Sequence, residues 1–315
     1  MQSRIVSTSS GRALLRFLRG DSVGKAIRLF ARPWVAYVLM SVTLAVLARR
    51  RFGAGHRPAD LEEYVAAALG RDGSATPARL RAGTATMTAA LAFPPRRLVG
   101  AGERDLPMTL LLDLVRTAEL ADEQLTELVG FVERRVAQVY RPGPAIGWRA
   151  LRWRRFHREL AGATPAWQWP RPEPGTRIGR VLLAMAVHEF DHAAELPDDD
   201  GFDGVEAVVG AAVRRLATGR YGAAGEAEIE ALAGRAAKRA TSPLVTAAEV
   251  RLLLDQARDG MARPGDLSRA DRYAARIGIL MQIVDDLGLL PSETCALLVA
   301  AEADATAAGF QPLPA

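Results

Sequence analysis

Apolar residues recur every three or four positions along most of this 315-residue chain. That spacing places apolar side chains on one face of an α-helix, and the alternating β-branched runs typical of strands are nearly absent. Gly, Pro and Asp punctuation such as "RPGPAIG" and "ARPGD" separates the helical segments. These segments are residues 60–69, 78–92, 107–138, 178–196, 203–219, 226–239, 244–259, 268–289 and 292–308. The sequence therefore predicts an all-α protein of mostly buried helices, and we expect no internal sequence repeat.

The chain divides by composition into two parts. Residues 1–56 form a basic and hydrophobic N-terminal extension, and residues 57–315 form the helical domain. With 49% hydrophobic and 24% charged residues, the chain can bury a large core. Residues 139–176, rich in Arg, Trp and Pro, predict a long insertion between helices, and segments of that kind are often functional.

The extension contains an uncharged apolar run, "PWVAYVLMSVTLAVLA" at residues 33–48, with arginines on both sides. A helix that spans a bilayer usually needs about 20 apolar residues, so this run is short. It also lacks the small-residue cleavage site of a removable signal peptide. Three interpretations stay open: a buried first helix, a membrane-associating interfacial anchor, or a marginal transmembrane span.

The charge and the cysteine content narrow the functional classes. The net charge is +5, and nearly all basic residues are arginines, with lysines only at Lys25 and Lys238. No recognition helix, aromatic platform or zinc-finger spacing accompanies this charge, so nucleic acid is not an expected partner. The single Cys295 rules out a disulfide framework. We therefore expect a cytoplasmic protein, with membrane contact through residues 33–48 as an option.

A pair of adjacent aspartates stands out in the apolar helical segment "RYAARIGILMQIVDDLGLL", residues 272–290. Gln282 and Asp286 are four residues apart and share a helix face, and Gly278 lies one turn earlier. Gly278 would let another helix approach closely. Asp285 and Asp286 sit near the helix end, where the helix dipole is unfavourable for carboxylates. A bound metal ion would offset that cost, whereas exposure to solvent is the simpler explanation.

This segment resembles the second aspartate-rich helix of the trans-polyprenyl diphosphate synthases, and further elements of that family follow the same order along the chain. "ARLRAG" at 78–83 is similar to the basic Lys-Arg-Leu-Arg-Pro element. "DLVRTAELADEQLTELVGFVERR" at 113–135 is similar to the first aspartate-rich helix, and "RATSPLVTAA" at 239–248 to the Lys-Thr element. The resemblance implies an isoprenoid-synthase-like helical bundle around a central cavity, and a dimer.

The resemblance also implies a chemistry and a set of site residues. Magnesium ions held between two acidic helix rims would neutralise the diphosphate that leaves an allylic prenyl diphosphate. The catalytic residues would be Asp285, Asp286, Gln282 and Thr241; the substrate-binding residues Arg79, Arg81, Arg134 and Arg135; and the metal ligands Asp285, Asp286, Glu123 and Glu127. The predicted activity is prenyl transfer or terpene cyclisation with Mg²⁺ as cofactor.

The sequence departs from the family pattern at several of these positions. Glu123 and Gln124 stand where the first rim has two aspartates, and Leu289 replaces a third aspartate of the second rim. Ala78 and Ala240 stand where the diphosphate-binding lysines would be. Each lost charge-assisted contact is worth about 1.5 to 3 kcal/mol. The alternative to an enzyme is therefore an inactive homologue, either the partner subunit of a heteromeric synthase or a prenyl-lipid binder.

A second motif competes with this interpretation. "HEFDH" at residues 188–192 matches the His-Glu-x-x-His pattern of zinc peptidases. On a helix it would place His188 and His192 on one face for zinc, with Glu189 as the base. The third ligand has no candidate, and Asp191 is a charged residue where the motif normally has none. A remote alternative is thus a zinc metallopeptidase.

Overall fold

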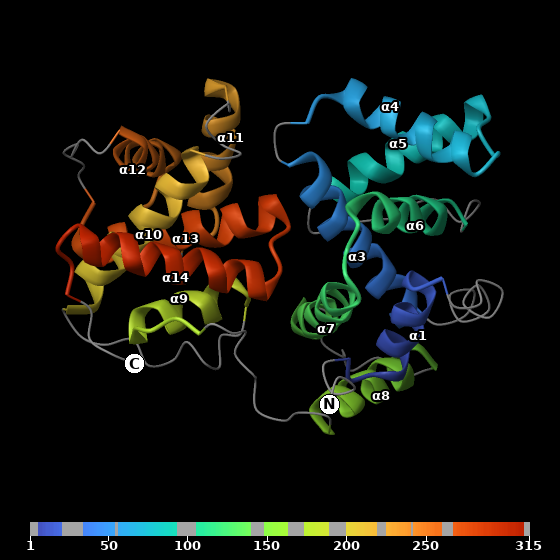
Figure 1. Ribbon diagram of the computed structural model, residues 1–315, viewed down its shortest axis with the longest axis horizontal. Coiled ribbons are helices and arrows are strands. Elements are labelled where there is room, and N and C mark those ends of the chain that lie inside the picture. The colour runs from blue at the N-terminus through green and yellow to red at the C-terminus, as the bar shows by residue number, and fades with distance from the viewer. Residues whose placement is uncertain are drawn as a thin grey trace. The chain divides into compact units, whose positions relative to one another are not determined.

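The computed structural model describes residues 6–20, 34–53, 56–92, 105–139, 148–162, 173–188, 200–218, 225–240, 242–259 and 267–311. These residues contain thirteen helices and no strand, which confirms the predicted all-α class. In chain order (Figure 1) the helices are α1 (Ser9–Leu18), α3 (Trp34–Phe52), α4 (Pro58–Arg71), α5 (Pro77–Leu91), α6 (Leu106–Ala118), α7 (Asp122–Val139), α8 (Trp148–Gly162), α9 (Arg177–Ala186), α10 (Asp200–Thr218), α11 (Glu226–Ala237), α12 (Ala247–Asp259), α13 (Arg269–Leu287) and α14 (Pro291–Ala307). Among the described helices, none combines the length and the apolar character needed to cross a bilayer.

The chain forms two compact units that divide after Gln168. Unit 1, Met1–Gln168, contains α1 and α3 to α8, and unit 2, Trp169–Ala315, contains α9 to α14. Each unit buries a core of its own. The division therefore falls inside the segment that we predicted as a single domain, residues 57–315, and residues 1–56 are not a separate unit. The predicted insertion at 139–176 contains the 15-residue helix α8.

Helix α3 corresponds to the apolar run of the N-terminal extension and lies in the core of unit 1. Leu39, Leu44 and Ala48 are fully buried. The helix packs against α1, α5, α6 and α7, which surround it in Figure 1. Because its apolar side chains are already covered by other helices of the unit, the buried-helix interpretation of residues 33–48 describes this segment.

The two units repeat one local motif at their first helices. The sequence Thr-x-x-Gly-Arg-x-Leu-Leu begins at Thr8 in unit 1 and at Thr176 in unit 2. Both threonines cap a helix N-terminus, because each side chain accepts a hydrogen bond from the glycine N–H three residues later. Our expectation of no repeat was therefore wrong: the matching residues are too few to stand out among the many Ala, Leu, Gly and Arg residues of this chain.

A buried glutamate completes the motif in each unit. Glu133 of α7 accepts hydrogen bonds from the backbone N–H groups of Ser7 at 2.8 Å and Thr8 at 2.9 Å, and from the Thr8 hydroxyl. Glu302 of α14 accepts the corresponding bonds from Gly175 N at 2.9 Å, Thr176 N at 3.1 Å and the Thr176 hydroxyl. We call each arrangement a glutamate clamp. It ties the first helix of its unit to the last of the six repeated helices.

The rest of the helical plan is repeated as well. In unit 1, α1 packs on α3 and α7, α4 on α5, and α6 on α3; in unit 2, α9 packs on α10 and α14, α11 on α12, and α13 on α10. Both α6 and α13 end at a left-handed residue, Glu119 (φ 48°) and Gly288 (φ 58°). Corresponding residues lie 168 positions apart up to the third helix and 169 apart near the end, as Thr8 and Thr176, and Glu133 and Glu302, show. The described helices thus form two copies of a six-helix unit, and α8 follows the first copy.

The copies carry opposite charge. Residues 1–168 contain 26 Arg and Lys residues and 14 Asp and Glu residues, a net charge of +12. Residues 169–315 contain 15 basic and 22 acidic residues, a net charge of −7. The net charge of +5 for the whole chain is therefore the sum of a strongly basic unit 1 and an acidic unit 2.

Candidate functional site

The candidate site is built around α13, which carries the paired aspartates. Ser268 caps the helix N-terminus, and Gly288 ends it in a left-handed conformation. Gly278 allows the close approach that its position predicted, because a Cβ there would lie 2.8 Å from the carbonyl oxygen of Ala236 at the end of α11. The sequence thus brings α13 against the C-terminal end of α11 inside unit 2.

Both aspartates are buried and paired with arginines of α11. Arg235, in the last turn of α11, places Nη2 2.7 Å from Oδ2 of Asp286. Arg239, just beyond the helix end, bonds Oδ2 of Asp285. The exposed fraction is only 1% for the Asp285 side chain and 6% for that of Asp286, which excludes the simpler interpretation that the pair meets solvent. The arginines supply the positive charge that burial of two carboxylates requires.

Two further polar side chains complete this buried cluster. Gln282 donates from Nε2 to Oδ1 of Asp286 at 2.7 Å, on the helix face that the two residues share. His188 lies with Nε2 3.7 Å from Oδ1 of Asp285. His188 has a φ of 64°, a conformation that non-glycine residues adopt at a cost. The six side chains Arg235, Arg239, Gln282, Asp285, Asp286 and His188 form what we call the α13 cluster.

The predicted magnesium ligands do not fit a metal site in this arrangement. Mg²⁺ needs hard oxygen ligands in a near-octahedral shell, and a guanidinium that bonds a carboxylate oxygen takes up the position that the ion would need. Asp285 and Asp286 each give an oxygen to an arginine. Among the described residues, no group of three or more His, Cys, Asp and Glu side chains is placed to hold a metal ion.

The other predicted site residues lie in unit 1 or outside the described residues. Glu123, Glu127, Arg134 and Arg135 are on α7, and Arg79 and Arg81 are on α5. Glu123 is exposed, and Arg79 pairs with Asp105 at 2.8 Å. Arg135 is buried with its guanidinium 5.8 Å from the ring centroid of Phe131. Thr241 lies outside the described residues. The first acidic rim and the second therefore belong to different compact units.

Unit 1 contains a counterpart of the α13 cluster on α6. Arg71 of α4 corresponds to Arg239, 168 residues later, and makes two bonds to Asp113 at 2.9 and 2.8 Å. Arg116 adds a third bond to the same carboxylate at 2.5 Å. Burial raises the pKa of Asp113, but the bonds from Arg71 and Arg116 outweigh it and hold that pKa below the usual value. In both units an arginine near the end of the third helix thus neutralises a buried carboxylate of the fifth.

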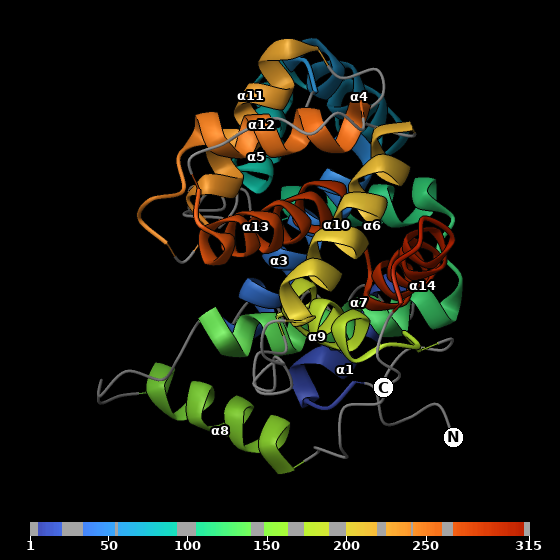
Figure 2. The same cartoon turned by 90° about the vertical axis from the view of Figure 1, so that its left-hand side faces the viewer.

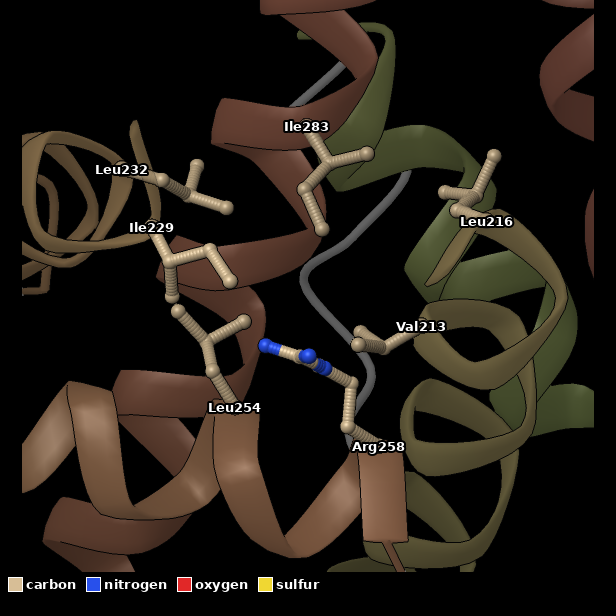
Figure 3. A pocket seen from close by; sticks show the side chains of 7 residues that line it. All are labelled: Val213, Leu216, Ile229, Leu232, Leu254, Arg258 and Ile283. Atoms are coloured by element: carbon tan, nitrogen blue, oxygen red, sulfur yellow. The ribbon is translucent and has the colours of Figure 1, made fainter. Parts of the chain in front are cut away.

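An apolar pocket lies in unit 2 between α10, α11, α12 and α13 (Figure 3). Ile283 of α13, Ile229 and Leu232 of α11 and Leu254 of α12 contribute its walls, and Arg258 reaches in from the end of α12. The empty space is about 330 Å³, which includes open solvent at the mouth. Because that figure counts the open mouth, the enclosed part is smaller still, and the pocket as it stands does not enclose a long hydrocarbon chain.

The zinc-peptidase motif is only partly described. Helix α9 ends at Ala186, and His188 follows in a left-handed conformation, so His188 is not part of a continuous helix with the preceding residues. Glu189, Asp191 and His192 lie outside the described residues. The described part of the motif places its first histidine beside Asp285 rather than in a zinc-binding helix.

No model of a known protein family, no curated protein and no solved structure matches this chain. The family resemblance therefore depends on the sequence elements alone.

The sequence analysis did not identify Arg235 and Arg239, the arginines that pair with the two aspartates. Arg235 and Arg239 lie four residues apart in "LAGRAAKRA", a spacing that puts two cations on one helix face. These arginines could have been found from two signals: their four-residue spacing, and the interval of 168 or 169 residues between corresponding positions of the two units. The spacing could show that the arginines share a face, but not that α13 packs against that face.

Proposed function

We propose that this chain is a divergent, non-catalytic relative of the trans-polyprenyl diphosphate synthases that acts as the partner subunit of a prenyl diphosphate synthase. The observation that carries the proposal is the arginine neutralisation of Asp285 and Asp286. In a synthase these two carboxylates must be available to magnesium when negative charge builds on the leaving diphosphate. Here they stabilise the contact between α11 and α13 instead.

The small pocket described in unit 2 fits a partner subunit better than a lipid binder that would use this pocket. A lipid binder needs a cavity that encloses most of its ligand. The pocket at Ile283 and Leu254 offers about 330 Å³ even with its open mouth included. A subunit that acts through protein contacts has no such requirement.

The enzymatic alternative remains a second candidate because the arginines of the α13 cluster could also bind phosphate oxygens. Arg235 and Arg239 are the kind of planar, bidentate donors that suit a diphosphate. If a prenyl diphosphate drew them away, Asp285 and Asp286 would become available, and Gln282 would still orient Asp286. The substrate would then have to overcome two buried ion pairs.

Pyrophosphate release separates these candidates. The purified chain is incubated with Mg²⁺ and geranyl, farnesyl or geranylgeranyl diphosphate, with and without isopentenyl diphosphate. We expect no release above the protein-free rate from the chain alone, and increased release when it is added to a prenyl diphosphate synthase encoded beside it. The Asp285→Asn variant should support the neighbouring synthase as well as the wild type does.

Two outcomes would overturn the proposal. Release by the chain alone that is lost in Asp285→Asn would establish the enzyme. Absence of complex formation with the neighbouring synthase, measured by light scattering of the mixture, together with no change in its rate would exclude the partner role. Zinc bound at one equivalent, lost in His188→Ala and accompanied by peptide hydrolysis, would favour the peptidase.

A further inference from the structure

Helix α8 follows the six repeated helices of unit 1, and its two faces differ in character. One face packs into the unit: Trp153 and Phe156 are buried, and their rings meet edge-on with centroids 5.6 Å apart. The opposite face carries Leu151, Arg154 and Arg158 at the spacing of successive helical turns, and all three are exposed. The helix lies at the edge of unit 1 in both views (Figures 1 and 2).

The attachment of α8 uses its only carboxylate and leaves much of its positive charge exposed. Residues 148–162 contain five arginines and one acidic residue, Glu159. Glu159 accepts a hydrogen bond from Ser9 N at 2.6 Å and pairs with Arg155 at 2.7 Å, so it joins the helix to the start of α1. Arg154 and Arg158 form no ion pair with any carboxylate of the described residues. The outward face therefore presents two guanidinium groups to an external partner.

The charged face of α8 also carries an exposed apolar side chain. Only three large apolar residues in the described part of the chain are strongly exposed. One is Leu151 on α8 at 55%, and another is Val139 at the end of α7 at 54%. Helices α7 and α8 pack against each other. A basic helix that adds an aliphatic side chain to its charged face suits the boundary between lipid headgroups and acyl chains.

From these observations we propose that the outward face of α8 binds the surface of a bilayer that contains anionic phospholipids. Arg154 and Arg158 meet the phosphate groups, and Leu151 enters the headgroup boundary. The net charge of +12 on unit 1 attracts the same surface over a longer range. Single-stranded nucleic acid fits less well, because base stacking needs exposed aromatic rings, and Trp153 and Phe156 face the interior.

Vesicle co-sedimentation of the full chain tests this proposal. We expect the protein to sediment with phosphatidylcholine vesicles that contain phosphatidylglycerol, not with pure phosphatidylcholine, and to dissociate as salt is raised. One basic residue near such a surface contributes about a fivefold change in partitioning, so Arg154→Glu with Arg158→Glu should weaken binding at least about twentyfold. Leu151→Ser should weaken it without any change in charge.

A charge-matched control distinguishes a specific face from general attraction. Arg81→Glu with Arg258→Glu makes the same change in net charge at exposed positions of α5 and α12. This control should bind vesicles nearly as well as the wild type. Circular dichroism and the unfolding midpoint establish that each variant is folded.

Three results would overturn the proposal. They are equal binding to neutral and anionic vesicles, an equal loss in the control and in the Arg154→Glu/Arg158→Glu variant, and an absence of vesicle binding in a folded wild type. Binding of an oligonucleotide that is lost in the Arg154→Glu/Arg158→Glu variant, without vesicle binding, would assign the face to nucleic acid instead.

Discussion

Unit 1 and unit 2 follow the same six-helix plan, but the arginines that pair with the carboxylates of the fifth helix differ in their exposure. In unit 1, Asp113 is held by Arg71 and Arg116, whose side chains are 42% and 63% exposed. In unit 2, Asp285 is held by Arg239, which is only 22% exposed, and Asp286 forms a second pair beside it. The adjacent aspartates of unit 2 thus extend a structural ion pair that is present in both units. A carboxylate pair that looks catalytic in sequence thus has a structural counterpart, Asp113, in the corresponding helix of unit 1, at the position that aligns with Gln282.

The largest difference between the units should appear when one carboxylate is removed. Asp285→Ala leaves Arg239 charged and mostly buried, so we expect a loss of about 3 to 5 kcal/mol in the free energy of unfolding. Asp113→Ala leaves Arg71 and Arg116 partly solvated, and we expect a loss of about 1 to 2 kcal/mol. Urea denaturation measures both losses, and hydrogen exchange in α13 and α6 locates them.

A double variant tests whether the loss of stability comes from the unpaired Arg239. Asp285→Leu combined with Arg239→Leu removes both charges and should restore most of the stability that Asp285→Ala loses. If Asp285→Ala and Asp113→Ala have equal effects, or if the double variant is as unstable as Asp285→Ala, the ion pair does not have the structural role we assign to it.

The glutamate clamps should respond alike in the two units. A Cβ at Gly11 would lie 1.9 Å from Oε1 of Glu133, and one at Gly179 would lie 1.9 Å from Oε1 of Glu302. Gly11→Ala and Gly179→Ala should therefore displace the carboxylate from its buried donors, each at a loss of about 2 to 3 kcal/mol. The unfolding midpoint in urea checks this result. Gly175→Ala is the control, because a Cβ there would come no closer than 3.9 Å to Glu302, and it should change stability by at most about 0.5 kcal/mol.

Acid should weaken unit 1 through Asp113. The folded-state pKa of this group lies below its usual value, because Arg71 and Arg116 outweigh the effect of burial. A carboxylate with a lowered pKa contributes stability above its unfolded pKa, and that contribution is lost as the pH falls through the folded pKa. We expect protection from hydrogen exchange in α6 to fall below about pH 3.8 in the wild type and to change less in Asp113→Asn. An identical acid response in both proteins would contradict the assignment.

The smallest expected effect concerns one left-handed position that the units share. Gly20 ends α1 with a φ of 80°, and His188 stands 168 residues later with a φ of 64°. His188→Gly should raise stability by about 0.5 to 1 kcal/mol through relief of the left-handed conformation, and Gly20→Ala should lower it by about 1 kcal/mol. Thermal unfolding of both variants checks these values. A loss of stability in His188→Gly would show that the contact between His188 and Asp285 outweighs the backbone strain.

Much of the local structure was predictable because helices depend on short-range spacing. The three- and four-residue periodicity predicted the all-α class and the approximate positions of most helices. The close helix contact at Gly278 and the helix face shared by Gln282 and Asp286 followed from their spacing. Even the repeat was present in the sequence, at an interval of 168 residues that becomes 169 near the end, although too few residues of the motif are shared for periodicity alone to reveal it.

The sequence by itself determined which residues lie on the same face of a helix and how charge is distributed between the two halves of the chain. It did not determine every helix end, because the predicted segment 107–138 is divided at Glu119 into α6 and α7. The tertiary structure decided what those faces meet. Asp285 and Asp286 present the same pattern whether a metal ion, water or a guanidinium lies opposite. Only the packing of α13 against α11 shows that Arg235 and Arg239 are their partners, because that contact joins residues about 50 positions apart and depends on the way whole helices fit together.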